Sequence, residues 1–296
     1  MLTKINCAPC IIDDLCGALE LLDLDSETKN KVIRDVFEFL SKEFSEDKIP
    51  SYFITEVHRI LKRVSGIKIP FKERRDKCNQ LGIEMINKIK KETLMMTEFE
   101  RFLFLSSWTI VSNHLDFRTV GTGYGFQMKQ IIEELEECIE EGLRIDQRRE
   151  IYNLAKKASK ILYIHDNVGE IAFDVLLIKE FLKYGADVTS ALREGPITSD
   201  ATIEDGYTVG LDKVASKIII AGPDTLGISL CEMSSDLKKA LQVSDLVIAK
   251  GQANYYALTE YKKNVPGKIA CLFRTKCENV SNEMNVSGKV NVAILL

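Results

Sequence analysis

Acidic and amide side chains stand at the end of one predicted buried strand, where a helix pattern takes over. The stretch YIHDNVGEIAFD, residues 163–174, starts as an apolar strand and continues as an amphipathic helix, with Asp166, Asn167 and Glu170 at the junction. Carboxylate and amide oxygens are the ligands that a hard divalent cation such as magnesium or manganese prefers. An aspartate at such a junction is also a common helix N-cap, so this stretch alone leaves a metal site and a cap as alternatives.

Polar and charged residues also follow the other predicted strands in the second half of the chain. They are Arg193, Ser199, Asp200 and Thr202 after the second strand, Asp224 and Thr225 after the third, Lys250 and Asn254 after the fourth, and Arg274 and Lys276 after the fifth. Because ligands bind beyond the carboxyl ends of the strands in an open parallel sheet, we expect these side chains to converge on one edge.

This mixture of residues suits phosphoryl chemistry. A hard cation neutralises phosphate oxygens and lowers the pKa of a bound water, while lysines and helix N-terminal amides bind phosphate and stabilise the leaving group. Each residue also has a plainer interpretation: Asp200 could cap a helix, and Lys250 could be a solvated strand end. The coincidence of several such residues at one edge favours a binding site.

The elements that must position these residues change in type near residue 150. Before it, apolar residues recur at three- and four-residue spacing, which predicts helices at 11–24, 29–44, 51–64, 71–91, 97–114 and 127–141. The last of these is acidic and solvated, and it follows a turn-rich loop, GTGYGF at 121–126. After residue 150, short apolar runs predict strands at 160–166, 186–193, 217–222, 245–251, 268–274 and 289–296.

Helix patterns such as 169–184 and 253–263 separate these strands, and such alternation implies a mostly parallel sheet covered on both faces. We therefore expect an α/β protein of two parts. Residues 1–150 form a helical domain, as one bundle or two, which lends residues to the pocket. This helical N-terminal part packs on residues 151–296, a Rossmann-like domain that carries the metal site.

The composition is that of a soluble globular protein, with 45% hydrophobic and 28% charged residues among 296. A net charge of −4 gives no reason to expect a nucleic-acid or anionic-membrane partner. No apolar run approaches the roughly 20 residues of a membrane-spanning helix. The first ten residues, MLTKINCAPC, lack the apolar core of a secretory signal, so the expected compartment is the cytoplasm.

Six segments, in order along most of the chain, together resemble one known family. They are CAPC, SNHLDF, DNVGEIAFD, GPITSDAT, DLVIAKGQANYYAL and RTKCE. The family is the one long labelled domain of unknown function 89, now regarded as metal-dependent damage-control phosphatases, and CAPC resembles the Cys-x-x-Cys of many archaeal-type members. The family fold, a helical N-terminal part on a Rossmann-like α/β part, agrees with the strand–helix pattern.

The resemblance implies a metal site and a role for one acid. Asp166 and Asn167 match the metal-binding Asp-Asn of the family, and Asp200 matches its third protein ligand. The implied cofactor is a divalent ion: magnesium, manganese, cobalt or nickel. Glu170 matches an acid that contacts the substrate or a metal-bound water.

The resemblance also implies the residues that surround a substrate. Lys250 and Asn254 match a Lys-Gly-x-x-Asn phosphate-side loop, and Lys276 matches a phosphate-binding lysine. Asn113 and Asp116 match residues that the helical part lends to the pocket. Two departures concern the helical wall of the pocket: Arg118 stands where a small residue such as glycine is expected, and Ser112 replaces a more usual glycine before Asn113.

The remaining cysteines and histidines carry weaker signals. Cys7 and Cys10 lie before any predicted strand, whereas a thioredoxin-type motif follows one. A zinc site would need two more ligands. We therefore expect a structural role for this pair, with metal or redox chemistry as the alternative. We expect His58 to be solvated on a charged helical face, His165 to point to the sheet face opposite Asp166, and His114 to line the pocket.

The residues and the resemblance together favour a divalent-metal-dependent phosphatase for a small phosphorylated metabolite, such as a sugar phosphate or cofactor-related phosphate. A role in metabolite damage control is what the resemblance implies. Asp166, Asn167 and Asp200 would hold the metal, and Lys250 and Lys276 would clamp the phosphate.

Two routes to cleavage stay open. A water activated by the metal, or by an acid such as Glu170 or Asp116, would attack phosphorus, or an aspartyl-phosphate would form. The alternatives in function are an S-adenosylmethionine-dependent carboxyl methyltransferase, which the missing glycine-rich nucleotide loop disfavours, and a non-catalytic phosphometabolite-binding protein.

Overall fold

A seven-stranded sheet forms the centre of the computed structural model, which describes residues 1–117 and 128–296. Within those residues the strands are β1 (Ile145–Asp146), β2 (Lys160–Ile164), β3 (Asp187–Arg193), β4 (Lys217–Gly222), β5 (Leu246–Lys250), β6 (Lys268–Arg274) and β7 (Asn291–Leu295). Their order is β1-β7-β6-β5-β2-β3-β4. Neighbouring strands are parallel except β6 and β7, which run antiparallel. The predicted α/β fold with a mostly parallel sheet is confirmed.

Six of these strands match the predicted runs to within two residues at each end. The exception is β1, which lies before residue 150 and which the sequence did not predict. It is two residues long and pairs with Val292 and Ala293 of β7. A segment this short shows no alternation of apolar and polar residues, so only its partner strand defines it.

The helices agree with the predicted ranges in the first half and alternate with strands in the second. They are α1 (Ala8–Leu21), α2 (Ser26–Glu43), α3 (Pro50–Ser65), α4 (Lys72–Glu92), α5 (Glu98–Val111), α6 (Met128–Glu141), α7 (Arg148–Ala155), α8 (Glu170–Lys183), α9 (Ile203–Thr208), α10 (Ser235–Val243), α11 (Gln252–Tyr261) and α12 (Glu278–Glu283). A short 3-10 helix, η3 (Ser112–Leu115), continues from α5. The loop predicted at 121–126, and the departure at Arg118, lie outside the described residues.

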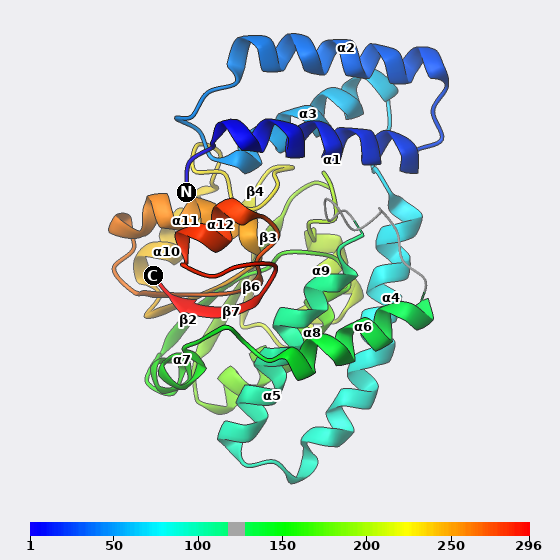
Figure 1. The fold of residues 1–296 in the computed structure, drawn as a ribbon. Helices are drawn as coiled ribbons and strands as arrows, with labels where there is room; N and C mark the ends of the chain where they lie inside the picture. Colours follow the sequence, from blue (N-terminus) through cyan, green and yellow to red (C-terminus); the bar gives the residue numbers. More distant parts are fainter. Residues whose placement is uncertain (118–127) are drawn as a thin grey trace.

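Helices cover both faces of the sheet (Figure 1). On one face α5, α7 and α8 pack with Tyr163 and Ile248 in one hydrophobic cluster. On the other face α10, α11 and α12 pack with Leu162 and Val247 in a second cluster. Because successive strand residues point to opposite faces, adjacent residues of β2 and β5 fill two different cores. This double burial explains why the strands read as continuous apolar runs.

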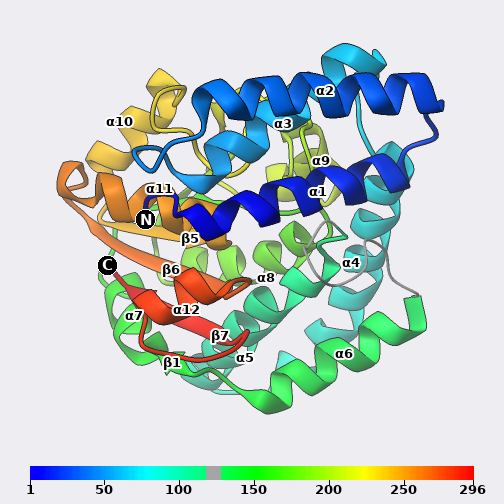
Figure 2. The ribbon, with the colours of Figure 1, turned by 45° about the horizontal axis from the view of Figure 1, so that its top comes forward.

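The first three helices form a layer of their own, at the top of Figure 1. Helices α1 and α2 both pack on α3, and α3 reaches the segment after β4, where Arg59 and Lys62 pair with Asp224. Helices α4 and α5 instead pack along α8, which covers the sheet (Figure 2). The domain division at residue 150 stays a prediction, and the helices before it contact both the sheet and the helix that covers it.

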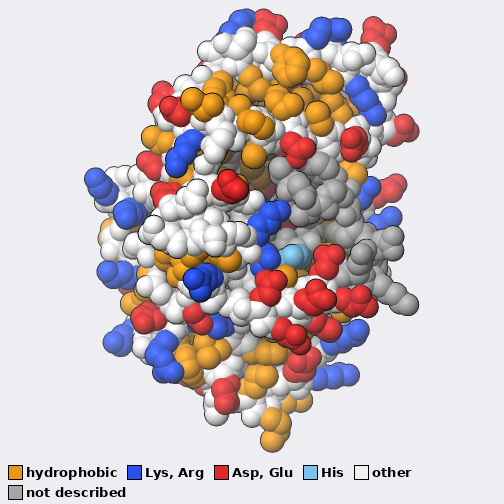
Figure 3. Space-filling view, viewed as in Figure 1, with side chains coloured by type: hydrophobic (Ala, Val, Ile, Leu, Met, Phe, Trp, Pro, Cys, Tyr) orange, Lys and Arg blue, Asp and Glu red, His pale blue; other side chains and the backbone are white. Residues whose placement is uncertain are grey.

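The face of the molecule seen in Figure 3 carries a marked acidic cluster. Acidic side chains gather over α6, whose six glutamates between residues 133 and 141 are exposed (Figure 3). The predicted solvated acidic helix is thereby confirmed. Within residues 1–117 and 128–296, none of the helices combines the length and apolar character that a bilayer crossing demands.

Candidate functional site

A short backbone pairing brings the three predicted metal ligands together. The segment after β2 runs antiparallel to the segment after β3: the amide of Val168 donates to Ser199 O at 2.9 Å, and the amide of Ala201 donates to Asp166 O at 2.7 Å. Asn167 and Asp200 lie opposite each other in this bridge. Two strand ends that are neighbours in the sheet thus hold Asp166, Asn167 and Asp200 side by side, all buried.

The turn between β5 and α11 closes on the same point. Gly251 has a φ of 78° and a ψ of 158°, a conformation that essentially only glycine adopts. A Cβ atom at Gly251 would overlap all three carboxylate atoms of Asp166. The Lys-Gly turn that the resemblance assigns to the phosphate side therefore lies directly against the first predicted metal ligand.

Two side-chain amides orient the acids around Asp166. Asn167 Nδ2 donates to Asp166 Oδ2 at 2.8 Å and to Glu170 Oε2 at 3.2 Å. Asn113 Nδ2, from η3, donates to the same two oxygens at 3.3 and 3.0 Å. Both amide nitrogens therefore face carboxylates, which leaves the amide oxygen of Asn167 for other partners.

The acids crowd one another in this buried setting. Burial raises the pKa of Asp166 well above its usual range, and the charges of Glu170 and Asp200 raise it further. A cation among these carboxylates would relieve both effects, because it favours their charged forms.

Asp116 connects the helical part to the segment after β3. Ser199 Oγ lies 2.6 Å from Asp116 Oδ1 and 2.9 Å from Asn167 Oδ1. A hydroxyl group carries one proton, so it can donate to only one of these oxygens. Ser199 can therefore donate to Asp116 Oδ1 or to Asn167 Oδ1, but not to both at once.

Lys276 approaches Asp116 from the end of β6. Its ammonium donates to Asp116 Oδ2 at 2.6 Å, and about a quarter of its side chain, 24%, is exposed. Burial lowers the pKa of Lys276, but the charges of Asp116 and Asp166 outweigh that effect and the net pKa is raised. The site therefore holds a charged ammonium next to its acids.

Lys250 lies behind Glu170. Its fully buried ammonium donates to Thr109 O and Glu170 Oε1, and it lies 3.4 Å from Asp174 Oδ1. Burial lowers the pKa of Lys250, but the charges of Asp174 and Glu170 outweigh it and the net pKa is raised. The interpretation of Lys250 as a solvated strand end is wrong. Its phosphate-binding role stays a prediction; in this arrangement its ammonium orients Glu170.

Asp174 is the second carboxylate beside the buried ammonium of Lys250. The carboxylate accepts hydrogen bonds from Tyr163 Oη at 2.6 Å and lies 2.8 Å from His165 Nδ1. Burial raises the pKa of Asp174, but the charge of Lys250 and the hydrogen bond with His165 outweigh it and the net pKa is lowered. Asp174 therefore supports Lys250 and does not reach the predicted ligands itself.

The side chain of Asn254 makes all of its hydrogen bonds within the protein. Its Nδ2 donates to His165 O at 3.1 Å and to Lys250 O at 2.7 Å. Its Oδ1 accepts from Ile228 N at 2.9 Å and from Arg193 Nη2 at 3.3 Å. A side-chain amide offers two donor hydrogens and two acceptor lone pairs, so these four bonds use them all. The substrate-binding role of Asn254 stays a prediction, and its bonds tie the start of α11 to the segment after β4.

The residues present fit a hard divalent cation. Asp166, Asn167 and Asp200 offer two carboxylates and an amide oxygen, the donor types that magnesium and manganese take. Among the described residues, no three His, Cys, Asp or Glu side chains are arranged so that they alone could hold a metal ion. The proposed set differs from such a group because it includes the amide of Asn167.

The sequence did not single out one contributor, Arg75 of α4. Its Nη1 donates to Thr198 O at 2.8 Å and its Nη2 donates to Asp200 O at 2.9 Å, so it fixes the backbone around a predicted ligand. Arg75 lies in the charged run FKERRDK, where nothing distinguishes it from its solvated neighbours. Only its burial in the fold identifies it.

One of the histidine predictions can be judged directly, and the pocket-lining role of His114 stays a prediction. The prediction that His58 is solvated is wrong: its side chain is fully buried, with Nε2 2.7 Å from Asp14 Oδ2. His114 directly follows Asn113, and its Nε2 lies 3.2 Å from Cys138 Sγ. Burial, assisted by the charge of Arg274, lowers the pKa of His114 to about 4, so the ring is neutral near pH 7.

The N-terminal cysteine pair lies at the start of α1. Cys7 is the N-cap residue of this helix, its sulfur accepts a hydrogen bond from Asn279 Nδ2 at 3.4 Å, and Cys10 lies in the first turn. All eight cysteines fall within the described ranges and are free. The structural role of Cys7 and Cys10 stays a prediction.

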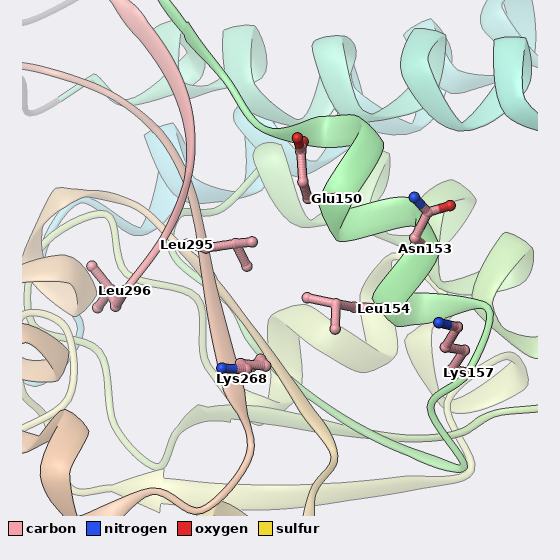
Figure 4. A pocket seen from close by; sticks show the side chains of 7 residues that line it. All are labelled: Glu150, Asn153, Leu154, Lys157, Lys268, Leu295 and Leu296. Atoms are coloured by element: carbon pink, nitrogen blue, oxygen red, sulfur yellow. The ribbon is translucent and has the colours of Figure 1, made fainter.

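An open hollow of about 380 Å³ lies away from these residues, between α7 and the end of β7 (Figure 4). It is lined by Glu150, Asn153, Leu154, Lys157, Lys268, Leu295 and Leu296. Lys268 is the first residue of β6, so the hollow lies at the amino edge of the parallel strands. The candidate site lies at the carboxyl edge, where an open parallel sheet binds its ligands.

Comparison with known proteins gives one consistent family. Residues 3–291 match the model of the damage-control phosphatase ARMT1-like domain. A protein of Methanocaldococcus jannaschii described as uncharacterized is 33% identical over 98% of this chain and 94% of its own length. A damage-control phosphatase of Archaeoglobus fulgidus is 30% identical over 95% of this chain and 94% of its own.

A solved structure agrees with the sequence matches. The crystal structure of a DUF89 family protein from Pyrococcus horikoshii superposes with a TM-score of 0.87 and 30% identity, and the match covers 99% of each chain. The resemblance drawn from the six motifs is thereby confirmed over the whole chain.

Proposed function

This chain belongs to the damage-control phosphatase ARMT1-like domain family, and from that premise we propose that it uses a divalent metal ion to hydrolyse a small phosphorylated metabolite. The family and the named relative support a phosphatase of the damage-control type. The metal dependence and the substrate class, a sugar phosphate or a cofactor-related phosphate, are part of the proposal.

One observation carries the proposal: the bridge in which Asn167 lies opposite Asp200, with Asp166 beside them and the ammonium of Lys276 2.6 Å from Asp116. Oxygen donors of the kind that a hard cation prefers and a charged ammonium of the kind that binds phosphate therefore lie at the same sheet edge, which supports the proposal. A cap explanation for Asp166 is weakened, because Gly169 and not Asp166 is the N-cap residue of α8.

The chemistry divides between the ion and the protein. A divalent ion, when bound by Asp166, Asn167 and Asp200, would neutralise phosphate oxygens and acidify a water. Lys276 stabilises the charge that develops on the phosphoryl group and its leaving oxygen. Its contact with Asp116 holds the ammonium in place before substrate arrives.

Glu170 is the general base that the geometry favours. The ammonium of Lys250 holds its Oε1, and the amides of Asn113 and Asn167 hold its Oε2, so the carboxylate has one orientation. A base must be fixed within hydrogen-bond reach of the water that it deprotonates. Asp116 is the alternative base, because Ser199 and Lys276 orient it in the same way.

The proposal is tested by phosphate release from a panel of sugar phosphates and cofactor phosphates. Chelator-treated protein is assayed alone and with magnesium, manganese, cobalt or nickel, and inorganic phosphate is measured. We expect release from at least one compound that requires added metal. Folded protein that releases no phosphate with any compound and metal, or that binds sugar phosphates without turnover, would contradict the proposal.

Replacing Lys276 with methionine is expected to lower kcat/KM for the phosphorylated substrate by roughly 10- to 100-fold. Loss of a hydrogen bond to a charged group is worth about 1.5–3 kcal/mol, which corresponds to that range. The matched control is Lys217→Met, at the exposed first residue of β4, which should leave kcat/KM unchanged. Equal kinetics in the two variants would remove Lys276 from the phosphate site.

A further inference from the structure

Arg193, the last residue of β3, has a fully buried guanidinium whose partners are all near the predicted metal ligands. Its Nη2 donates to Asp200 Oδ2 at 2.8 Å, and its Nε donates to Thr225 O at 3.2 Å. The same Nη2 also lies within 3.3 Å of Asn254 Oδ1. One side chain thus joins a ligand to the segment after β4 and to the start of α11.

The contacts of Asp200 show what this arrangement does to the carboxylate. Its Oδ2 accepts from Arg193 and, at 2.8 Å, from the amide of Gly227. Its Oδ1 is 3.2 Å from Thr198 Oγ1. Two strong donors therefore fix one oxygen and the plane of the group, and Oδ1 is the oxygen that can serve a cation.

The hydrogen bonding of the guanidinium is incomplete, which argues against a purely stabilising role. Among residues 1–117 and 128–296, Nη1 of Arg193 has no hydrogen-bond partner, although it is buried. An unsatisfied buried donor destabilises a protein, and a buried ion pair is weak evidence for stability. Buried polar groups that lack a hydrogen-bond partner tend to lie at functional sites.

We propose that Arg193 is a positioning residue for the divalent-cation site, which acts by holding Oδ2 of Asp200 so that Oδ1 binds the ion. This inference rests on the proposed function, because it presumes that Asp200 is a metal ligand. The planar fork of arginine makes the role specific: Nε and Nη2 reach Thr225 and Asp200 together. A lysine offers a single ammonium and cannot span both partners in that geometry.

The direction in which cation affinity changes when Arg193 is replaced distinguishes a positioning role from a purely electrostatic one. Removing a buried cation near a metal site should strengthen cation binding if only Coulomb repulsion mattered. Loss of positioning has the opposite sign, because Asp200 is then free to turn its carboxylate away. A merely structural role would lower the unfolding temperature and leave the affinity of the folded protein unchanged.

The experiment measures binding of Mn²⁺ alone, by calorimetry, to the full chain and to Arg193→Met, Arg193→Lys and Arg101→Met. Arg101 is the matched control, because its Nε pairs with the buried Glu180 at 2.7 Å on the α5–α8 contact. We expect the Mn²⁺ dissociation constant to rise at least about 10-fold in Arg193→Met, the usual size of an effect on ligand support. Arg193→Lys should show a smaller rise of a few-fold, and Arg101→Met no change.

Thermal unfolding of the metal-free proteins accompanies the titrations and identifies any variant that fails to fold. If Arg193→Met does not fold, Arg193→Lys, which retains the buried charge, decides the matter by its Mn²⁺ affinity. Folded Arg193 variants that bind Mn²⁺ as tightly as the parent, or more tightly, overturn the inference and leave the proposed function intact. A parent chain that binds no Mn²⁺ overturns the metal site and this inference together.

Discussion

Replacing Asp166 with alanine is expected to reduce metal-dependent phosphate release by at least about 10³-fold while the protein stays folded. Loss of a group that only supports a metal ligand typically reduces activity or affinity by roughly 10–100-fold, and loss of a ligand should exceed that range. Burial raises the pKa of Asp166, and the charges of Glu170 and Asp200 raise it further, so removal of this carboxyl group also relieves crowding. The free energy of unfolding of the metal-free protein should therefore change little.

The control for this variant is Asp187→Ala, at the exposed first residue of β3, on the opposite edge of the sheet. Its turnover should equal that of the parent. The measurement is phosphate release at several metal concentrations, combined with thermal unfolding. Turnover within a few-fold of the parent in folded Asp166→Ala protein would end the assignment of Asp166 as a ligand.

Gly251→Ala is expected to have the second largest effect, a loss of activity of about 10²-fold or more, although alanine adds one methyl group. The new Cβ overlaps the carboxylate of Asp166, so either this ligand or the Lys-Gly turn must move. Displacement of one catalytic group by about 1 Å is enough for a loss of 10²-fold. The backbone strain of a non-glycine residue at this φ and ψ adds roughly 1–3 kcal/mol of destabilisation.

Gly185→Ala is a control for the strain. Gly185 also has a positive φ, 89°, but a Cβ atom there meets nothing within 4 Å. We expect Gly185→Ala to lower the unfolding temperature and to retain full activity, whereas Gly251→Ala should lose activity out of proportion to its stability. Parallel changes in the two variants would show that Gly251 serves the backbone alone.

The central strands could be predicted from the sequence because β2 and β5 are covered on both faces and are buried at almost every position. A doubly covered strand reads as a nearly continuous apolar run, and its short length together with its β-branched residues separates it from a helix. Strand β1 was not predicted, because its two residues, Ile145 and Asp146, form a strand only by pairing with β7. The antiparallel direction of β7 was not predicted either, since direction depends on the path of the chain between strands.

The predicted ligands could be found because they directly follow strands, and the carboxyl ends of parallel strands share an edge. What could not be predicted is which atom each side chain presents. Lys250 and Asn254 belong to a motif that the resemblance assigns to the phosphate side. In the structure Lys250 contacts Glu170 and Thr109, and Asn254 makes its hydrogen bonds within the protein. Those partners come from distant segments, and a single sequence does not pair them.

Burial is the second property that the sequence hides. His58 lies in a helix with many charged residues, but it faces Asp14 of α1 and is fully buried. Arg75 looks like an ordinary basic residue until the fold places it against the backbone of Asp200, and the expected position of Arg193 at the sheet edge did not reveal that its guanidinium contacts Asp200. Long-range contacts of this kind decide whether a charged residue supports a site or is solvated.

The most direct test of the metal site is a crystal structure of the full chain grown with Mn²⁺, with anomalous scattering data collected to locate the ion. We predict one anomalous peak within about 2.0–2.3 Å of oxygens from Asp166, Asn167 and Asp200, a range typical of small divalent ions. A protein that shows Mn²⁺-dependent phosphate release, but whose manganese peak lies elsewhere or contacts none of these three residues, would contradict the account.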